Sequence, residues 1–219
     1  MASYKVPARQ ATAEIREKGS RFLAVVGAAA GEEEARAALA ALARRHPDAT
    51  HLCWALRLGW PPRERSSDAG EPAGTAGVPM LHVLRGAGIS DVMAVVARWF
   101  GGVKLGKGGL ARAYAAAVRA ALAELPTQVR VPSVRLALSA PLDRIGAVKR
   151  LVHPPEVELE SEDYGALGSA EIVLRVEEGR RASLEQALAG LRVKVEPAAT
   201  DAPRRTTDLL SRSPVPPRR

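Results

Sequence analysis

The chain has 219 residues, of which 47% are apolar and 26% charged, the composition of a soluble globular protein of one large or two small domains. Its single cysteine, Cys53, excludes an internal disulfide and a metal site built from several cysteines. No apolar run approaches the ~18 residues of a membrane span, and residues 1–19 lack the apolar core of a signal peptide. We therefore expect a cytoplasmic protein without membrane association.

The net charge of +8 is unevenly distributed. Residues 1–131 hold 18 Lys and Arg against 11 Asp and Glu, whereas residues 132–199 hold 9 against 11. This asymmetry favours binding of a polyanion by the first part of the chain, although an Arg-rich surface also serves solubility alone. Residues 200–219, rich in Pro, Ser and Arg, are predicted to be a disordered basic tail.

The first elements show clear strand and helix patterns. Residues 10–17 and 21–29 predict a hairpin that turns at Gly19. Residues 31–46 predict a helix, because acids occupy its first turn and basic residues its last. Residues 51–59 alternate as a strand, with His51 and Cys53 on one face. The opposite face of that strand carries Leu52, Trp54, Leu56 and Leu58.

A long loop and a buried strand follow. Residues 60–79 have loop composition throughout, and a structureless loop of this length in a compact domain usually has a function. Residues 79–88 predict a short helix, and the near-continuous apolar run of residues 91–100 predicts a buried central strand. Residues 101–109 predict a glycine-rich loop, and residues 110–125 a helix. The buried stripe of that helix is predicted to be Leu110, Tyr114, Ala117, Val118, Ala121 and Leu122.

Beyond two prolines, Pro126 and Pro132, a second pattern of elements begins. Its order is strand, helix, strand, strand, helix, strand, over residues 134–140, 142–152, 157–163, 170–178, 183–191 and 193–197. This order is the split βαβ, or ferredoxin-like, arrangement. We therefore predict an α+β protein with domains at residues 1–131 and 132–199. Four carboxylates in and directly before the strand predicted at residues 157–163 are expected to share one solvated strand face: Glu156, Glu158, Glu160 and Glu162.

The glycine-rich loop is the strongest candidate for a binding site. Glycines between a strand and a helix can present successive N–H groups to an anion, and the helix start adds partial positive charge. Residues 92–123 contain five basic residues and no acid. The candidate phosphate-binding or nucleic-acid-binding residues are Arg98, Gly101, Gly102, Lys104, Gly106, Lys107, Gly108 and Arg112. The alternative is a purely structural turn between strand and helix.

Two nucleotide-binding motifs fit this loop incompletely. Gly101 to Lys107 has the P-loop spacing G-x-x-x-x-G-K, but Gly108 replaces the Ser or Thr that coordinates Mg²⁺. GKGGLA fits a relaxed dinucleotide fingerprint, yet no strand ending in an acid follows the helix. We therefore predict no nucleotide hydrolysis and no cofactor.

A second group of candidates lies in the long loop. Asp68 and Glu71, with Thr75 nearby, could act in acid–base catalysis or hold Mg²⁺, but such residues more often bind loop N–H groups. His51 and Cys53 share a strand face, yet neither a zinc site nor a cysteine nucleophile is complete with these two residues alone. We predict no metal site, and treat Asp68, Glu71, Thr75 and His51 as accessory to the glycine-rich loop.

Several blocks of the chain resemble the IMPACT/YigZ family. The blocks are GSRFLA, THLCWAL, SSDAGEPAGTAGVPML and GISDVMAVVARWFGGVKLG, the last continuing as GKGGLARAY. They occur in the family's order across residues 18–118. One departure is Ala69, which stands where the family usually has a second acid before Gly-Glu-Pro, and this weakens any Mg²⁺ or acid–base role of the loop.

The resemblance implies a first domain of the ribosomal-protein/RNase PH-like α+β type and a second domain similar to the last domain of elongation factor G. It also implies a link to translation, since eukaryotic relatives act in translational control through a ribosome-associated activator of a stress kinase.

Three functions are compatible with these features. The first is a non-enzymatic, translation-associated protein that binds RNA or the ribosome through the basic glycine-rich loop. The second is an enzyme that acts on a phosphorylated small molecule at the same loop, in which Asp68 and Glu71 could serve catalysis. The missing acid at Ala69 counts against this function, and we assign no catalytic residue. The third is a protein-interaction module, with a translation factor as its partner.

Overall fold

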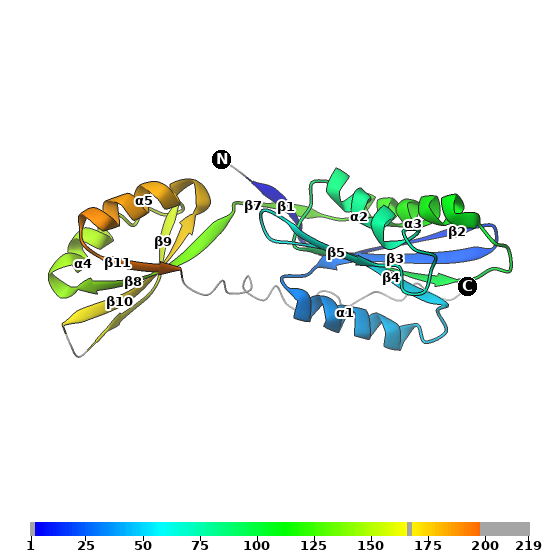
Figure 1. Cartoon of the computed structure of the whole chain (residues 1–219), viewed down its shortest axis with the longest axis horizontal. Helices are drawn as coiled ribbons and strands as arrows, with labels where there is room; N and C mark the ends of the chain where they lie inside the picture. Colours follow the sequence, from blue (N-terminus) through cyan, green and yellow to red (C-terminus); the bar gives the residue numbers. More distant parts are fainter. Residues whose placement is uncertain (1–2, 166–167, 198–219) are drawn as a thin grey trace. The chain divides into compact units, whose positions relative to one another are not determined.

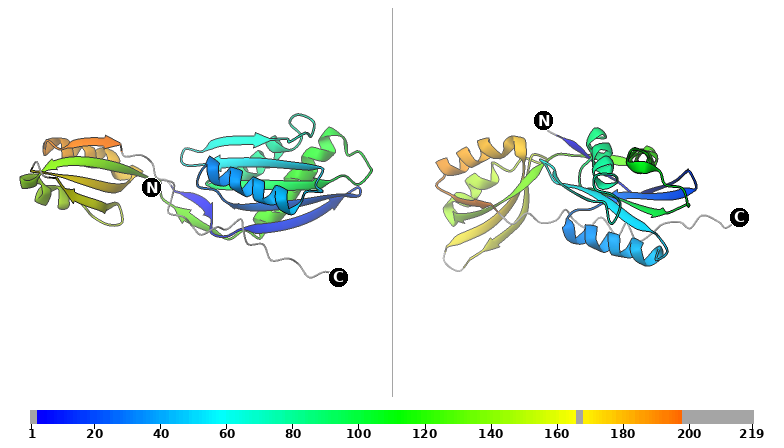
Figure 2. Two further views of the ribbon diagram at one scale, coloured as in Figure 1. Left: turned by 90° about the horizontal axis from the view of Figure 1, so that it is seen from below. Right: turned by 45° about the vertical axis from the view of Figure 1, so that its right-hand side comes forward.

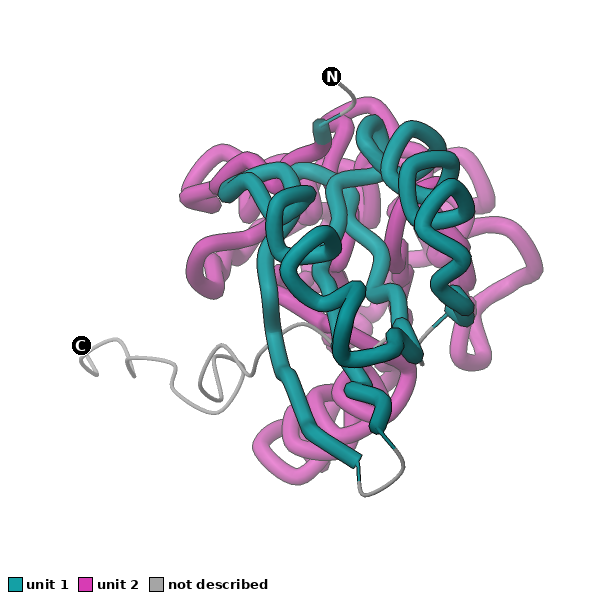
Figure 3. The backbone as a smooth tube through the Cα atoms, turned by 90° about the vertical axis from the view of Figure 1, so that its left-hand side faces the viewer, with its two compact units in different colours: residues 1–3, 131–201 teal, residues 4–130, 202–219 magenta. Residues whose placement is uncertain are grey.

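The computed structural model describes residues 3–165 and 168–197 and confirms a two-domain α+β protein. The described residues form two compact units, Tyr4–Arg130 and a second unit from Val131 onward (Figure 3). Each unit has its own hydrophobic core. The tail predicted at residues 200–219 lies outside the described residues. Within the described ranges, no helix is long and apolar enough to cross a membrane.

The first unit is built on a five-stranded sheet with strand order β2-β3-β6-β4-β5, in which all neighbours are antiparallel (Figure 1). The strands are β2 (Ala11–Glu17), β3 (Ser20–Ala28), β4 (His51–Leu58), β5 (Arg63–Ser67) and β6 (Val92–Trp99). The hairpin of β2 and β3 is confirmed, with Lys18 and Gly19 at its turn. The central place predicted for the apolar strand β6 is also confirmed, because a central strand is buried on both faces.

Helices cover both faces of this sheet. Helix α1 (Glu32–Arg45) packs on one face, and α2 (Gly77–Gly86) and α3 (Gly106–Ala123) pack on the other (Figure 2). The alternation predicted for β4 is confirmed: its leucines and Trp54 pack with α1, whereas Cys53 packs with α2 and α3. The stripe predicted for α3 is buried except for Leu122, which is half-buried.

Two predictions in this unit were wrong in part. Residues 60–79 are not loop throughout, because Arg63–Ser67 forms the edge strand β5, whose charged residues show no apolar alternation. The glycine-rich segment is shorter than predicted, since α3 already begins at Gly106 rather than at Leu110. Gly106, Lys107, Gly108 and Gly109 therefore form the first turn of α3, and only residues 101–105 link it to β6.

The sequence patterns also missed a two-stranded ribbon. Strand β1 (Tyr4–Pro7) pairs antiparallel with β7 (Thr127–Arg130), with Tyr4 opposite Arg130. Asp91 links the two strands, because its Oδ2 accepts hydrogen bonds from the Tyr4 hydroxyl at 3.0 Å and from Arg130 Nη1 at 2.6 Å. The first and last strands of the unit are therefore direct neighbours.

The second unit has the predicted ferredoxin-like topology. Its elements are β8 (Ser133–Pro141), α4 (Leu142–Lys149), β9 (Val157–Tyr164), β10 (Ser169–Glu177), α5 (Glu178–Gly190) and β11 (Lys194–Pro197). The strand order is β11-β8-β10-β9 with antiparallel neighbours, as the split βαβ arrangement requires. The core lies between this sheet and the two helices.

A register shift in the pairing of β9 with β10 changes which of the β9 carboxylates lie on the same face of the sheet. Between Val173 and Leu174 of β10 the pairing with β9 skips one residue, as in a β-bulge. Glu160 bonds Arg135 of β8 at 2.5 Å, whereas Glu162 lies opposite the buried Ile172 and bonds Lys149 of α4 at 2.8 Å. The prediction that all these carboxylates share one face was therefore wrong for Glu162.

Candidate functional site

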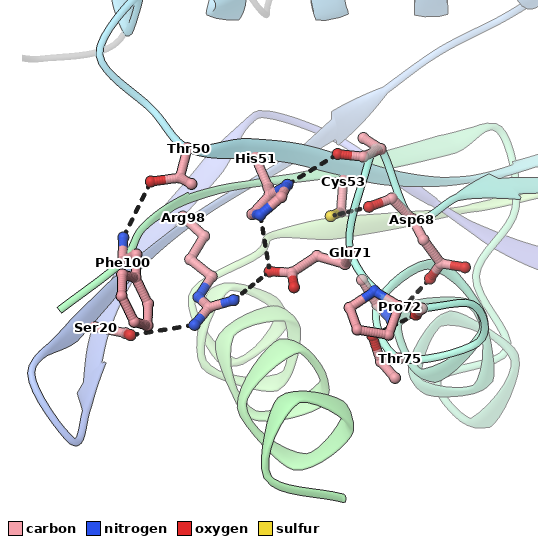
Figure 4. Close-up of polar contacts among 12 residues, drawn as sticks. Ser20, Thr50, His51, Cys53, Asp68, Glu71, Pro72, Thr75, Arg98 and Phe100 are labelled. Carbon is pink, nitrogen blue, oxygen red and sulfur yellow. Dashed lines mark hydrogen bonds and ion pairs between the residues drawn. The ribbon is translucent and has the colours of Figure 1, made fainter. Parts of the chain in front are cut away.

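A buried polar cluster lies in the first unit between the sheet, α3 and the loop before α2 (Figure 4). Its residues come from elements far apart in the sequence: Ser20 of β3, His51 and Cys53 of β4, Glu71 of the loop, Arg98 of β6 and Tyr114 of α3. Glu71 is at the centre of the cluster: Arg98, Tyr114 and His51 face its carboxylate. Cys53 bonds the backbone of the same loop, and Ser20 bonds Arg98.

Arg98 and Glu71 form a buried ion pair. Arg98 is 5% and Glu71 8% exposed, and Arg98 Nη1 donates to Glu71 Oε1 at 2.5 Å. The Tyr114 hydroxyl donates to the same oxygen at 2.7 Å, and Arg98 Nη2 donates to Ser20 Oγ at 3.3 Å. The guanidinium is therefore turned into the protein. Arg98 was predicted among the phosphate-binding residues, but the structure does not bring it to the surface with the lysines.

His51 binds the loop and faces the ion pair. Its Nδ1 lies 3.0 Å from the carbonyl oxygen of Ala69, which can only accept, so we assign the ring proton to Nδ1. Its Nε2 then points towards Glu71 Oε1 at 4.0 Å. The imidazole thus joins the strand to the loop turn that carries Glu71.

Cys53 is a buried structural thiol. Its Sγ bonds the carbonyl oxygen of Asp68 at 2.9 Å and lies 3.3 Å from the Tyr114 hydroxyl. Burial raises the pKa of the Cys53 thiol to about 12, so the thiolate needed for nucleophilic attack is scarce at neutral pH. In the described part of the chain, no three or more His, Cys, Asp or Glu side chains converge as metal ligands.

Asp68 organises the loop rather than pairing with Glu71. Its carboxylate accepts three backbone N–H groups, those of Gly74, Ala76 and Gly77, each at 2.8 Å. The last two lie at the start of α2, where N–H groups have no partner within the helix. Thr75 Oγ1 similarly donates to the carbonyl oxygen of Pro72 at 2.6 Å. Asp68 and Glu71 therefore serve separate partners, which favours the loop-structuring interpretation over a paired-carboxylate site.

The bonds to Asp68 predict a pH-dependent stability. Burial alone would raise the pKa of Asp68, but the three N–H donors together lower it below its ordinary value. The stability that ionised Asp68 contributes is therefore present above its unfolded-state pKa of about 3.9 and is lost as the pH falls through the lower folded-state pKa. We expect Asp68→Asn to cost about 1 kcal/mol at pH 7, in the range of N-terminal capping residues, and less at pH 3.

Urea unfolding followed by tryptophan fluorescence at both pH values measures this difference, because all three tryptophans lie in the first unit. Glu14→Gln is the matched control, since Glu14 makes only exposed ion pairs. A cost for Asp68→Asn that is the same at pH 3 and pH 7 would contradict the role given to the ionised carboxylate.

Residues 101–105 are fixed where they leave the sheet. Gly101 packs against the β2–β3 turn so closely that a Cβ atom there would lie 1.9 Å from the carbonyl carbon of Gly19. The Gly101 N–H donates to Ser20 Oγ at 3.2 Å, and Gly102 has a φ of +85°. Glycine is thus required at Gly101 by the close approach of two backbones and is favoured at Gly102 by its left-handed conformation.

The remaining predicted residues gather around the start of α3. Lys104, Lys107 and Arg112 are exposed, and none of them forms an ion pair with any described residue. Gly106 and Gly108 lie in the first turn of α3, which contains no acid and receives no side-chain cap. Exposed cations and a helix start without a side-chain cap therefore occur together at one end of α3.

The sequence reasoning missed three residues of this region: Ser20, Tyr114 as a polar group, and Phe100. Tyr114 was assigned only to the apolar stripe, although a buried tyrosine hydroxyl usually has a hydrogen-bond partner. Arg98 itself gave a signal, since a charge inside a strand predicted to be buried requires an acid nearby. No sequence pattern identified Ser20.

Comparisons with known proteins identify the family to which the chain belongs. The Impact N-terminal domain family matches residues 18–122. An IMPACT family member of Haemophilus influenzae is 38% identical over 169 residues, covering 76% of this chain and 82% of that protein. YigZ of Escherichia coli, also an IMPACT family member, is 37% identical over 179 residues, covering 80% and 86%.

A solved structure supports the same conclusion over nearly the whole chain. A crystal structure described as a hypothetical protein matches with a TM-score of 0.68 and 31% identity, covering 92% of this chain and 100% of that one. The similarity therefore includes both units and not only the first. The chain belongs to the IMPACT family.

Proposed function

We propose that this protein is a non-enzymatic, translation-associated RNA-binding protein of the cytoplasm, and that Lys104, Lys107 and Arg112 bind RNA phosphates. The observation that carries the proposal is the position of these three exposed cations, without ion pairs among the described residues, around the uncapped start of α3. The family's link to translational control, implied by the resemblance of the sequence blocks, supports RNA on or near the ribosome as the ligand.

The physical basis is electrostatic. An uncapped helix start presents N–H groups and the positive end of the helix dipole, both of which favour a phosphate. Each Lys or Arg that neutralises a phosphate also releases counterions from the nucleic acid. Binding of this kind has little sequence preference, as suits a protein whose cations contact the RNA backbone.

The bonds of Asp68 and Glu71 weigh against the enzymatic alternative. A catalytic acid–base pair needs carboxylates that face a substrate, but Asp68 binds the start of α2 and Glu71 is held by Arg98 and Tyr114. The protein-interaction alternative would use the same exposed loop, and the salt dependence of binding separates it from RNA binding.

Replacing Lys104, Lys107 and Arg112 with alanine should weaken binding to RNA of any sequence and flatten its salt dependence. If each cation neutralises one phosphate, the slope of log K against log salt should change by about 2 to 3, at ~0.7 to ~0.9 per contact. Fluorescence anisotropy of a labelled RNA, titrated at several salt concentrations, measures both quantities.

Two controls make the result specific. Arg119→Ala removes another exposed cation of α3, near the opposite end of the helix, and should leave the slope nearly unchanged. Deleting residues 203–219 removes five arginines and tests whether affinity comes from that segment instead. If the deletion abolishes binding and the triple variant binds as the wild type does, the proposal fails and the protein-interaction function is favoured.

A further inference from the structure

Phe100 is an exposed aromatic ring on a fixed backbone. It follows the last residue of β6 and is 47% exposed. Its N–H donates to Thr50 Oγ1 at 3.1 Å (Figure 4). The N–H of the next residue, Gly101, donates to Ser20 Oγ at 3.2 Å. The backbone at and after Phe100 is therefore held by Thr50, which directly precedes β4, and by Ser20 of β3, so the ring is presented in a defined position.

One side of this ring is already occupied. The guanidinium carbon of the buried Arg98 lies 5.6 Å from the Phe100 ring centroid and 5.4 Å from that of Phe22. Arg98 is held in place by Glu71, so it supports the ring from the protein side. The exposed area of Phe100 is then on its outer side, where a flat group can stack.

The ring is also close to the proposed phosphate contacts. Lys104 is four positions after Phe100 in the chain, so their Cα atoms are at most ~14 Å apart. Cations beside an exposed aromatic ring are the combination used to bind single-stranded nucleic acid, in which the cations contact phosphates and the ring stacks on a base. Bases of a duplex are stacked on one another and cannot be reached in this way.

We infer that Phe100 stacks on an unpaired base and that the site takes single-stranded RNA rather than duplex RNA. This inference rests on the proposed function, since the cations at the start of α3 supply the phosphate contacts. The stacking of Phe100 on a base would add to these phosphate contacts an interaction that does not depend on the charges of the site. The ligand class is therefore a short single-stranded segment, such as a loop or an unpaired end.

The test compares three probes of equal length by fluorescence anisotropy: a single-stranded RNA, a ribose-phosphate oligomer without bases, and a blunt RNA duplex. Phe100→Leu keeps an apolar side chain but removes the ring. It should weaken binding of the single strand by about 5- to 100-fold, or about 1 to 3 kcal/mol, and leave binding of the base-free oligomer unchanged. Phe100→Trp should restore binding of the single strand.

Val103→Ala is the matched control, because Val103 is exposed in the same loop but carries no ring. If Phe100→Leu binds the single strand as the wild type does while the triple cation variant binds it weakly, the base contact is refuted and the proposed function stands. If the wild type binds none of the probes, both are refuted. Equal binding of single strand and duplex by the wild type would also overturn the inference.

Discussion

Glu71→Ala is expected to destabilise the first unit by about 3 to 5 kcal/mol. The substitution removes the carboxylate that pairs with Arg98 and leaves a guanidinium 5% exposed without its counter-charge. Breaking a buried ion pair from one side costs this much because the remaining charge stays desolvated. The Tyr114 hydroxyl loses its acceptor at the same time, which adds to the cost.

Urea unfolding followed by tryptophan fluorescence measures this effect in the first unit alone, since Trp54, Trp60 and Trp99 all lie there. Glu14→Ala is the control, because its ion pairs are exposed and should contribute less than about 1 kcal/mol. Adding Arg98→Met to Glu71→Ala should recover part of the loss, because the unpaired charge is then gone. A cost no larger than that of Glu14→Ala would show that the ion pair is not an important part of the fold.

Gly101→Ala is expected to cost about 3 kcal/mol or more, at or above the upper end of the usual range for overpacking. The new Cβ would lie 1.9 Å from the carbonyl carbon and 2.1 Å from the carbonyl oxygen of Gly19. Both are backbone atoms, so no side-chain rotation can relieve the contact. The β2–β3 turn and the chain leaving β6 would have to separate, and the hydrogen bond from Gly101 to Ser20 would be strained with them.

Gly86→Ala is the matched control for this substitution. Gly86 is the last residue of α2, has an ordinary backbone conformation, and has no neighbouring atom within 4 Å of the position that a Cβ would take. Alanine there should be neutral or stabilise by up to about 1 kcal/mol. Thermal unfolding of both variants gives the comparison. A wild-type melting temperature for Gly101→Ala would mean that the two backbones do not approach each other as described.

The sequence predicted those parts of the fold in which apolar residues recur with a clear period. The long helix α3, the buried strand β6 and the second unit all have such patterns, and each was found. The strands β1, β5 and β7 were missed because each is short, has a single partner strand, and carries charged or isolated apolar residues. Short edge strands are defined by their neighbours more than by their own residues, so periodicity does not reveal them.

The sequence allowed the residues of the candidate site to be named by type, but it did not reveal how they are arranged. The loop with Asp68 and Glu71, the glycines and the lysines were all named from the sequence, but their partners were not. Arg98 was grouped with the lysines because it is near them in sequence. In the structure its side chain instead points into the protein and pairs with Glu71. The β-bulge that displaces Glu162 is likewise a property of pairing between strands, which one strand's sequence does not contain.

The pairing of β1 with β7 has a mechanical consequence. Tyr4 and Arg130 are opposite each other, so the chain enters and leaves the first unit at the same end of this ribbon. Tension on the flanking chain would pull these two residues apart across the ribbon and load its hydrogen bonds one after another, beginning with the contacts of Asp91. The ribbon would therefore open one residue pair at a time, whereas the five-stranded sheet is held by its own, separate ladders. Under such tension the ribbon would be the first part of the unit to open; it consists of Tyr4–Pro7 and Thr127–Arg130.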